Sequence, residues 1–263
     1  MRTLMQRALI CHARNERKSQ GFLTDMPDTR LSVYESGEYL DANPDWHMED
    51  SAWKAANISE MLKRESVSFE TAVEVGCGAG LILQELAGDF PEKQWAGFDI
   101  SPDAEQFWQR WADGPVTYQR EDYLSTSEAN DLVLLIDVFE HVDDYIGFLR
   151  RLSGLGKAFV FHIPLDLNAQ GLMRGSMLKS RAHVGHLHYF SKDTALATLR
   201  DTGYEIKAWQ FTGSSQHAGR SSRPLRTRIA NLPRRMLFPL APETTALLMG
   251  GYSLLVLAEP TAR

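Results

Sequence analysis

Three glycines at alternate positions are the residues of this sequence whose spacing points most directly to chemistry. The segment at residues 73–80 reads VEVGCGAG, and an apolar stretch, LIL, follows it. Glycine lets the backbone turn sharply and lets a ligand lie against the main chain. The free N–H groups that open a following helix attract an anion. The pattern therefore predicts a strand, a ligand-binding loop at Gly76, Gly78 and Gly80, and a helix.

The elements that would position this loop alternate along the chain. Short runs rich in Val, Ile and Leu alternate with amphipathic segments, which is typical of βαβ units and a parallel sheet. We predict a helix that begins at Asp50 or Ser51. Strands are predicted at 72–76, 94–99, 116–119, 131–137, 158–163, 204–211 and 252–259, and helices at 80–87, 103–112, 142–152 and 191–202. The fold class is α/β, a doubly wound seven-stranded sheet.

Three segments depart from this alternation. Residues 1–45 are polar and punctuated by Gly and Pro, so we expect an N-terminal arm or lid before a domain at 46–263. Insertions at 164–190 and 213–242 interrupt the domain. Loops of this length within a compact domain are usually functional or partly helical.

Composition excludes several classes of protein. The chain has 263 residues, 43% of them hydrophobic and 24% charged, and a net charge of −6. These values exclude a disordered or fibrous protein, and no nucleic-acid partner is expected. Its two cysteines provide neither a disulfide framework nor a Cys-based zinc site, and its apolar runs are too short for a membrane span. We expect a cytoplasmic protein.

The charge is unevenly distributed. Seven basic residues and no acidic one lie between Glu205 and Glu243, so this stretch carries +7 and the remainder −13. The basic stretch could hold an acceptor that carries phosphate or carboxylate, or rest on an anionic membrane surface. It could also be a solvated basic face paired with the acidic body.

A dinucleotide fingerprint is one interpretation of the glycine loop, but the third glycine stands one position too early for it. With Glu74 the pattern is Glu-x-Gly-x-Gly-x-Gly, which resembles motif I of class I S-adenosylmethionine-dependent methyltransferases. The resemblance extends over about residues 50–210, and more weakly to the final strand. The chain is most similar to the subgroup of ubiquinone-biosynthesis-like and small-molecule or sugar O-methyltransferases. The resemblance implies a Rossmann-like, mostly parallel sheet with an antiparallel last strand and helices on both faces.

The resemblance also implies cofactor-binding residues beyond the glycine loop. Asp99, with Ile100 beside it, ends the second strand, where the family holds the two ribose hydroxyls. An ionised carboxylate only accepts hydrogen bonds, so it suits two donors of this kind. Asp122, with Tyr123 beside it, follows the third strand, where the family places an acid near the adenine. S-adenosylmethionine is the implied cofactor, and the predicted cofactor residues are Glu74, Gly76, Gly78, Gly80, Asp99, Ile100, Asp122, Tyr123 and Asp137.

Methyl transfer to a neutral acceptor usually needs a base with a pKa near the working pH, which points to histidine. His141 follows the fourth strand directly, so we predict that it is the general base, with Asp137 or Glu140 orienting it or the substrate. His162, at the end of the fifth strand, is the second candidate. A metal site at His183, His186 and His188 is the alternative to a structural role for these residues; we predict no metal.

The sequence therefore predicts a methyltransferase that acts on a hydroxyl, or less favourably an amine, of a small-molecule, glycan or lipid-linked acceptor. An NAD-type oxidoreductase is the alternative enzyme. A catalytically silent methyltransferase-like binding subunit is the alternative outside catalysis. The basic insertion at 213–242 provides a possible peripheral membrane contact.

Overall fold

A computed structural model describes residues 48–126, 128–213 and 231–261 of the protein. The predicted arm at 1–45 and residues 214–230 of the basic stretch lie outside the described residues. Tyr39 and Trp46, two aromatic residues that precede the first helix, lie outside them as well.

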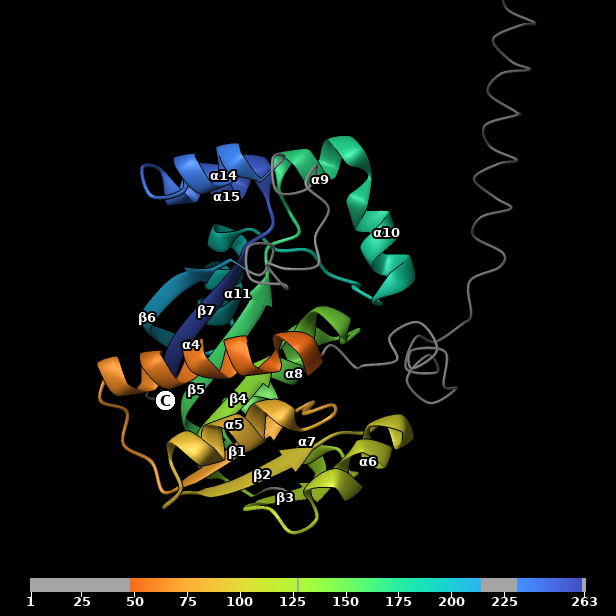
Figure 1. Ribbon diagram of the computed structural model, residues 1–263, viewed down its shortest axis with the longest axis vertical. Coiled ribbons are helices and arrows are strands. Elements are labelled where there is room, and N and C mark those ends of the chain that lie inside the picture. Colours follow the sequence, from red (N-terminus) through yellow and green to blue (C-terminus); the bar gives the residue numbers. More distant parts are fainter. Residues whose placement is uncertain (1–47, 127, 214–230, 262–263) are drawn as a thin grey trace, which may run out of the picture.

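The described chain forms one seven-stranded sheet in the order β3-β2-β1-β4-β5-β7-β6 (Figure 1). The last strand, β7, runs antiparallel to both of its neighbours, and the other pairs are parallel. The strands are β1 (Thr71–Val75), β2 (Gln94–Phe98), β3 (Val116–Gln119), β4 (Asn130–Ile136), β5 (Gly156–Pro164), β6 (Tyr204–Thr212) and β7 (Ser253–Pro260). All seven predicted strands are present, and the predicted fold class is confirmed.

Helices cover both faces of the sheet because successive strand residues point to opposite sides. On β4, Leu132 and Leu134 pack with α4 (Ser51–Arg64), α5 (Leu81–Asp89) and α6 (Pro102–Trp108). Val133 and Leu135 pack on the other face with α8 (Tyr145–Leu152) and α11 (Lys192–Asp201). Strands buried on both faces explain the nearly continuous apolar runs in the sequence.

The remaining short elements are helical turns. They are η1 (Met48–Asp50), η2 (Gln109–Trp111), α7 (Tyr123–Thr126) and η3 (Phe139–His141). The predicted helix at 142–152 begins three residues later than expected. Asp144 caps it, since its side chain accepts a hydrogen bond from the Gly147 backbone N–H, and Val142 before it is extended.

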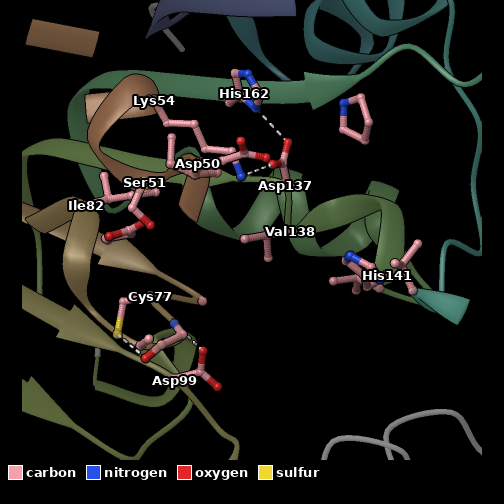
Figure 2. Close-up of a pocket in the computed structure, with 18 of the residues that line it drawn as sticks. Asp50, Ser51, Lys54, Cys77, Ile82, Asp99, Asp137, Val138, His141 and His162 are labelled. Atoms are coloured by element: carbon pink, nitrogen blue, oxygen red, sulfur yellow. Dashed lines mark hydrogen bonds and ion pairs between the residues drawn. The ribbon is translucent and has the colours of Figure 1, made fainter. Parts of the chain in front are cut away.

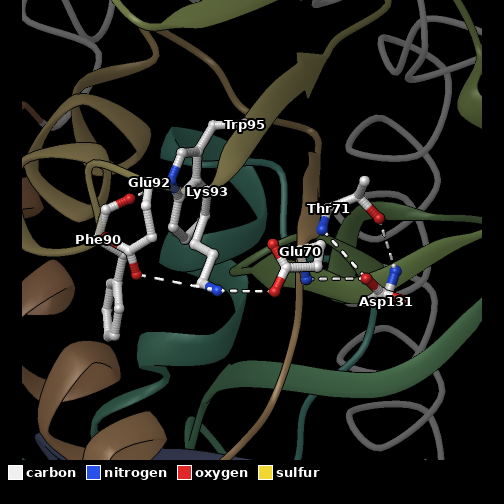
Figure 3. A network of polar contacts seen from close by, with 7 residues as sticks. All are labelled: Glu70, Thr71, Phe90, Glu92, Lys93, Trp95 and Asp131. Carbon is white, nitrogen blue, oxygen red and sulfur yellow. Dashed lines mark hydrogen bonds and ion pairs between the residues drawn. The ribbon is translucent and has the colours of Figure 1, made fainter.

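A polar contact network fixes the register of β1 against β4 at their amino ends (Figure 3). Asp131 Oδ2 accepts hydrogen bonds from the backbone N–H groups of Glu70, at 2.8 Å, and Thr71, at 3.2 Å. Thr71 Oγ1 in turn accepts from the Asp131 N–H at 3.0 Å. Hydrogen bonds from Lys157 and these two amides hold the pKa of Asp131 below its ordinary value. The network is at the end of the sheet opposite the strands' carboxyl ends, so it stabilises the sheet away from any ligand.

Both predicted insertions contain helices that meet at one end of the molecule (Figure 1). Residues 164–190 contain α9 (Ala169–Arg174) and α10 (Ser176–His183), and residues 213–242 contain α14 (Leu232–Leu237). Helix α15 (Pro242–Met249) begins where the second predicted insertion ends. We call these four helices the cap. Arg234, on α14, connects three of these helices. Its Nη2 donates hydrogen bonds to the carbonyl of Met249 on α15, at 2.6 Å, and to Oε1 of Gln170 on α9, at 3.3 Å.

Candidate functional site

A cavity of about 630 Å³ opens at the carboxyl ends of the central strands (Figure 2). Four of the residues that line it, Gly76, Asp99, Asp137 and Pro164, follow or end β1, β2, β4 and β5. This edge of an open α/β sheet is where such folds bind ligands. Helix α4 closes one side through Asp50, Ser51 and Lys54.

The glycine loop has the conformation that its residue types predict. Gly76, Gly78 and Gly80 have φ values of +74°, +52° and +79°, in the left-handed region that L-residues with side chains adopt at a cost. A Cβ atom on Gly76 would lie 2.8 Å from Val138 Cγ2, and one on Gly80 would lie 2.5 Å from Tyr118 Cε1. A side chain at either position would therefore have to displace Val138 or the Tyr118 ring, and all three glycines line the cavity.

Three aromatic side chains hold the carbonyl groups of this loop. Trp108 Nε1 donates to the Gly78 carbonyl at 2.9 Å, and Trp111 Nε1 donates to the Ala79 carbonyl at 3.0 Å. The Tyr118 hydroxyl donates to the Gly80 carbonyl at 2.9 Å. These contacts turn the loop carbonyls toward the protein, so the loop is positioned before any ligand binds.

Asp99 connects the second strand to the glycine loop. Its Oδ2 accepts from the Gly78 N–H at 2.8 Å, and its Oδ1 accepts from the Ser101 N–H at 2.8 Å. Burial raises the pKa of Asp99, and these backbone N–H bonds counteract the rise. Ile100 beside it lines the cavity and is 46% exposed, so it offers an apolar surface next to the carboxylate.

Glu74 is a buried acid at the base of the loop. Its side chain is 1% exposed and its Oε2 atom has no hydrogen-bond partner. Burial raises the pKa of Glu74 to about 8, while the nearby Lys54 ammonium lowers it. A buried carboxyl oxygen without a donor is costly, and a ligand that brings a donor would remove the cost. This orphaned oxygen and the glycine wall fit the predicted cofactor.

Four side chains form a continuous polar chain, and the first three of them, Lys54, Asp137 and His162, line the cavity (Figure 2). Lys54 Nζ lies 2.8 Å from Asp137 Oδ2, Asp137 Oδ1 lies 2.6 Å from His162 Nδ1, and His162 Nε2 lies 2.9 Å from Thr212 Oγ1. Burial alone would raise the pKa of Asp137, but its contacts with His162 and Lys54 outweigh burial and hold the pKa below its ordinary value. Burial would lower the pKa of Lys54, but Asp137 raises it. Asp137 is therefore a carboxylate in this site.

Asp137 also carries backbone strain at the exit of β4. Its φ is +57°, one of two positive values among the non-glycine residues of the described ranges. Such conformations persist where surrounding contacts hold them, and they concentrate at functional sites. Asp137 and Glu140 were the two acids predicted to orient His141 or the substrate. Asp137 instead contacts His162, whereas Glu140 Oε1 lies 3.9 Å from His141 Nε2.

A second group of acids and histidines surrounds His141. Glu140 is fully buried, and neither of its carboxyl oxygens has a hydrogen-bond partner. Burial, followed by the charge of Asp137, raises the pKa of Glu140 well above its ordinary value. The His141 and His186 rings lie 4.9 Å apart, edge to face, and Asp166 Oδ2 lies 2.6 Å from His186 Nδ1.

Glu140, His141 and His186 are also the group of described residues whose donor atoms, all within 4.8 Å of one another, could hold a metal ion. The histidine trio considered from the sequence is not brought together in this way. His183 is exposed at the end of α10, and His188 Nε2 lies 3.0 Å from the Val142 carbonyl. A protonated carboxyl is a poor metal ligand, so the absence of a metal remains our prediction.

The structure places most of the predicted site residues on the cavity wall. Glu74, Gly76, Gly78, Gly80, Asp99, Ile100, Asp137, His141 and His162 line it. Asp122 and Tyr123 do not. Asp122 is exposed and its Oδ1 accepts from the Leu124 N–H at 3.0 Å, while the buried Tyr123 hydroxyl donates to the Glu128 carbonyl at 2.8 Å. Their predicted contact with the cofactor stays a prediction.

Lys54 and Thr212 are residues of the site that sequence reasoning missed. Lys54 lies on α4, one turn from the helix start, and its side chain is 14% exposed. Thr212 is the last residue of β6, which is separated from β5 by β7. For Lys54, the signal in the sequence was a lysine in the helix that precedes the glycine loop. No sequence pattern indicated Thr212.

A sheet in this order, with a left-handed glycine loop and an acid at the next strand's end, defines a Rossmann-like methyltransferase fold. Residues 46–208 match the family model of a methyltransferase domain, which is more than half of the chain. The chain therefore belongs to this methyltransferase family.

Individual relatives agree with this class at low identity. A malonyl-[acyl-carrier protein] O-methyltransferase of Porphyromonas gingivalis is 28% identical over 89 residues, which is 33% of this chain and 34% of that protein. The structure of magnesium protoporphyrin IX methyltransferase from Synechocystis with bound SAH has a TM-score of 0.51 and 17% identity, over 80% of this chain and 83% of that one. Coclaurine N-methyltransferase bound to N-methylheliamine and SAH has a TM-score of 0.52 and 16% identity, over 78% and 70%.

These findings confirm the predicted enzyme class. The predicted cofactor, S-adenosylmethionine, agrees with the family and with the same Synechocystis enzyme solved with bound SAM. The alternative of an NAD-type oxidoreductase is disfavoured accordingly.

Proposed function

We propose that this methyltransferase transfers the methyl group of S-adenosylmethionine to a hydroxyl group of a small-molecule or lipid-linked acceptor. The observation that supports the proposal is that one cavity contains both the glycine loop with Asp99 and the imidazole of His141. A cofactor held by the first would face the second across the cavity. The named relatives include both O- and N-methyltransferases, so the preference for oxygen rests on the site.

The chain's residues would hold the cofactor in three ways. Asp99 would accept hydrogen bonds from two adjacent hydroxyls, and Gly76, Gly78 and Gly80, which line the cavity without side chains, would leave room for the ligand against the main chain. The unpartnered Oε2 of Glu74 would accept a hydrogen bond from the cofactor's ammonium group. When bound, the cofactor supplies a methyl group on a sulfonium, already activated for displacement.

The remaining work of the protein is positioning and proton removal. His141 accepts the acceptor's hydroxyl proton on an imidazole nitrogen as the methyl group is transferred. Burial raises the pKa of the neighbouring Glu140 well above its ordinary value. The Lys54–Asp137–His162 chain fixes the opposite wall, since both ring nitrogens of His162 have partners. His162 is therefore a positioning residue in this proposal, and His141 the catalytic one.

Transfer of a labelled methyl group to a panel of acceptors tests the proposal. The panel contains matched hydroxyl, amine and carboxyl compounds, each in a water-soluble and a long-chain form. We expect incorporation into a hydroxyl compound that falls when His141 is replaced by Asn. A carboxyl acceptor is already ionised at neutral pH and needs no base, so transfer to carboxyl compounds alone, insensitive to His141→Asn, contradicts the proposal. Cofactor binding without transfer to any compound supports the silent binding subunit instead.

A further inference from the structure

The two insertions that interrupt the domain build one surface, although residues 191–212 separate them in the sequence. Helix α9 contacts α15, α10 contacts α9, and α14 contacts α15. The Arg234 guanidinium joins three of these helices, as described above. Figure 1 shows the four cap helices together at one end of the molecule, away from β2 and β3.

Large apolar side chains on the outside of this cap are unusually exposed. Of eleven exposed large hydrophobic residues in the described ranges, nine lie on the cap or in its connections. Met173 and Leu240 are the extremes, at 82% and 83% exposed. The others are Leu172, Leu178, Leu232, Met236, Leu237, Leu247 and Leu248. Scattered apolar residues on a surface need no explanation, but a concentration of this kind marks a binding face.

The charges on the cap have nearly one sign. Its helices carry Arg174, Lys179, Arg181, Arg234 and Arg235 and a single acid, Glu243. Glu243 Oε1 lies 3.2 Å from Nζ of Lys192, on the side of α15 that faces α11. The surface is therefore cationic as well as apolar, in a protein whose net charge is −6.

We propose that the cap docks on an anionic lipid surface. Short helices that present leucine and methionine among arginine and lysine match the composition of interfacial segments, which insert apolar side chains between lipids while cations contact the headgroups. A folded protein partner is usually bound through aromatic and arginine anchors in well-packed pockets. The exposed apolar residues of the cap are instead leucine and methionine.

The cap is placed to deliver an acceptor from this surface. Pro164 before α9, Val184 and His186 after α10, and Ser253 after α15 all line the cavity. These three connections from the cap therefore contribute to the lining of the cavity. This step rests on the proposed function: the acceptor would be an amphiphile whose hydroxyl enters the cavity while its apolar part stays in the lipid. No helix in the described ranges is both long and apolar enough to cross a bilayer, so the contact is peripheral.

Sedimentation of the full chain with vesicles tests the docking surface. The vesicles are neutral phosphatidylcholine or the same lipid with about one third phosphatidylglycerol. We expect binding to the anionic vesicles that weakens as salt is added. The cation variant is Arg174→Gln/Lys179→Gln/Arg235→Gln. Each removed cation should lower the affinity for anionic vesicles about fivefold, so this variant should bind them roughly 100-fold more weakly than the unaltered protein.

Two further variants separate the cap from general surface charge. The apolar variant, Met173→Ser/Met236→Ser/Leu240→Ser, should also lose binding by about 100-fold or more, because each side chain no longer enters the lipid. The matched control, Arg110→Gln/Arg120→Gln/Arg151→Gln, removes three exposed cations away from the cap and should bind like the unaltered protein. All three variants should bind S-adenosylhomocysteine normally, which shows that they are folded.

Three outcomes would overturn the lipid proposal. They are no binding to either kind of vesicle, equal binding to both kinds, or a loss of vesicle binding in the control variant equal to that in the cap variants. An acidic acyl carrier protein, titrated in parallel, identifies a protein site if the cap variants weaken its binding and vesicles do not bind. Failure of the docking proposal leaves the binding of S-adenosylhomocysteine intact, whereas failure of the proposed function would leave vesicle binding intact.

Discussion

Replacement of Gly80 by Ala tests whether the glycine loop is built as the structure shows. Gly80 has a φ of +79°, which costs an L-residue about 1–2 kcal/mol. The added Cβ would also lie 2.5 Å from Tyr118 Cε1 and 2.7 Å from Cζ. The Tyr118 ring is stacked on Trp108 at 5.4 Å between centroids, and its hydroxyl accepts a hydrogen bond from Gln84 Nε2 at 2.9 Å. The ring therefore cannot move aside freely.

Overpacking of this kind costs a further 1–3 kcal/mol or so, which gives a total of about 2–5 kcal/mol. Urea denaturation measures the loss, and calorimetric titration with S-adenosylhomocysteine should show affinity lower by about tenfold or more, the equivalent of one lost hydrogen bond.

Gly88→Ala is the matched control. Gly88 lies near the end of α5, the helix that Gly80 precedes, and a Cβ there meets no atom within 4 Å. Alanine should stabilise this exposed helical position by about 0.5–1 kcal/mol and leave ligand affinity unchanged. Equal stability and affinity for Gly80→Ala and the unaltered protein would refute the reasoning, because a loop that tolerates a side chain at Gly80 has neither the left-handed backbone nor the close packing on Tyr118 that the structure shows.

Three other predictions concern the acids and bases of the cavity. His141→Asn should lower turnover by about 10²–10⁴-fold and leave the affinity for S-adenosylhomocysteine nearly unchanged; an unaltered rate removes His141 as the base. Glu74 has a pKa of about 8 against an ordinary 4.5, so the folded state holds its proton more tightly and the unfolding free energy should fall as pH rises from about 4.5 to 8. Glu74→Gln should remove up to about 5 kcal/mol of this decline in urea denaturation, and parallel pH profiles for the two proteins would contradict the assignment. Dialysis against EDTA should leave turnover unchanged, because the raised pKa of the buried Glu140 carboxyl weakens it as a metal ligand beside His141 and His186; activity lost on dialysis and restored by a divalent metal would show a metal site.

The fold could be predicted because its signals are local. Strands β1, β2, β4 and β5 are short apolar runs, and burial on both faces makes such runs continuous in the sequence. The loop from Gly76 to Gly80 could be predicted because only glycine adopts its positive-φ conformation at little cost in free energy. The first residue of a helix is harder to predict. The chain is extended at Val142, and Asp144 caps the start of α8. Helix propensity alone does not show which acidic residue caps the helix.

The site could be predicted only where one residue's place follows from its own strand. Asp99, Asp137 and His162 are strand-end residues, and parallel strands bring their carboxyl ends together. The partners could not be predicted, since Lys54 reaches Asp137 from the first helix and Thr212 reaches His162 from a strand that is not its neighbour. The same limit applies to the cap, whose two halves meet through tertiary packing that no sequence period records.

Calorimetric titration of the full chain with S-adenosylhomocysteine, S-adenosylmethionine and NAD tests the central claim most directly. We expect saturable binding of the first two with one site per chain and no binding of NAD. Asp99→Asn, which removes a negative charge where the structure holds two backbone N–H donors, should weaken both by about 10–100-fold. Binding of NAD in their place, or S-adenosylhomocysteine binding that Asp99→Asn leaves unchanged, would contradict the account.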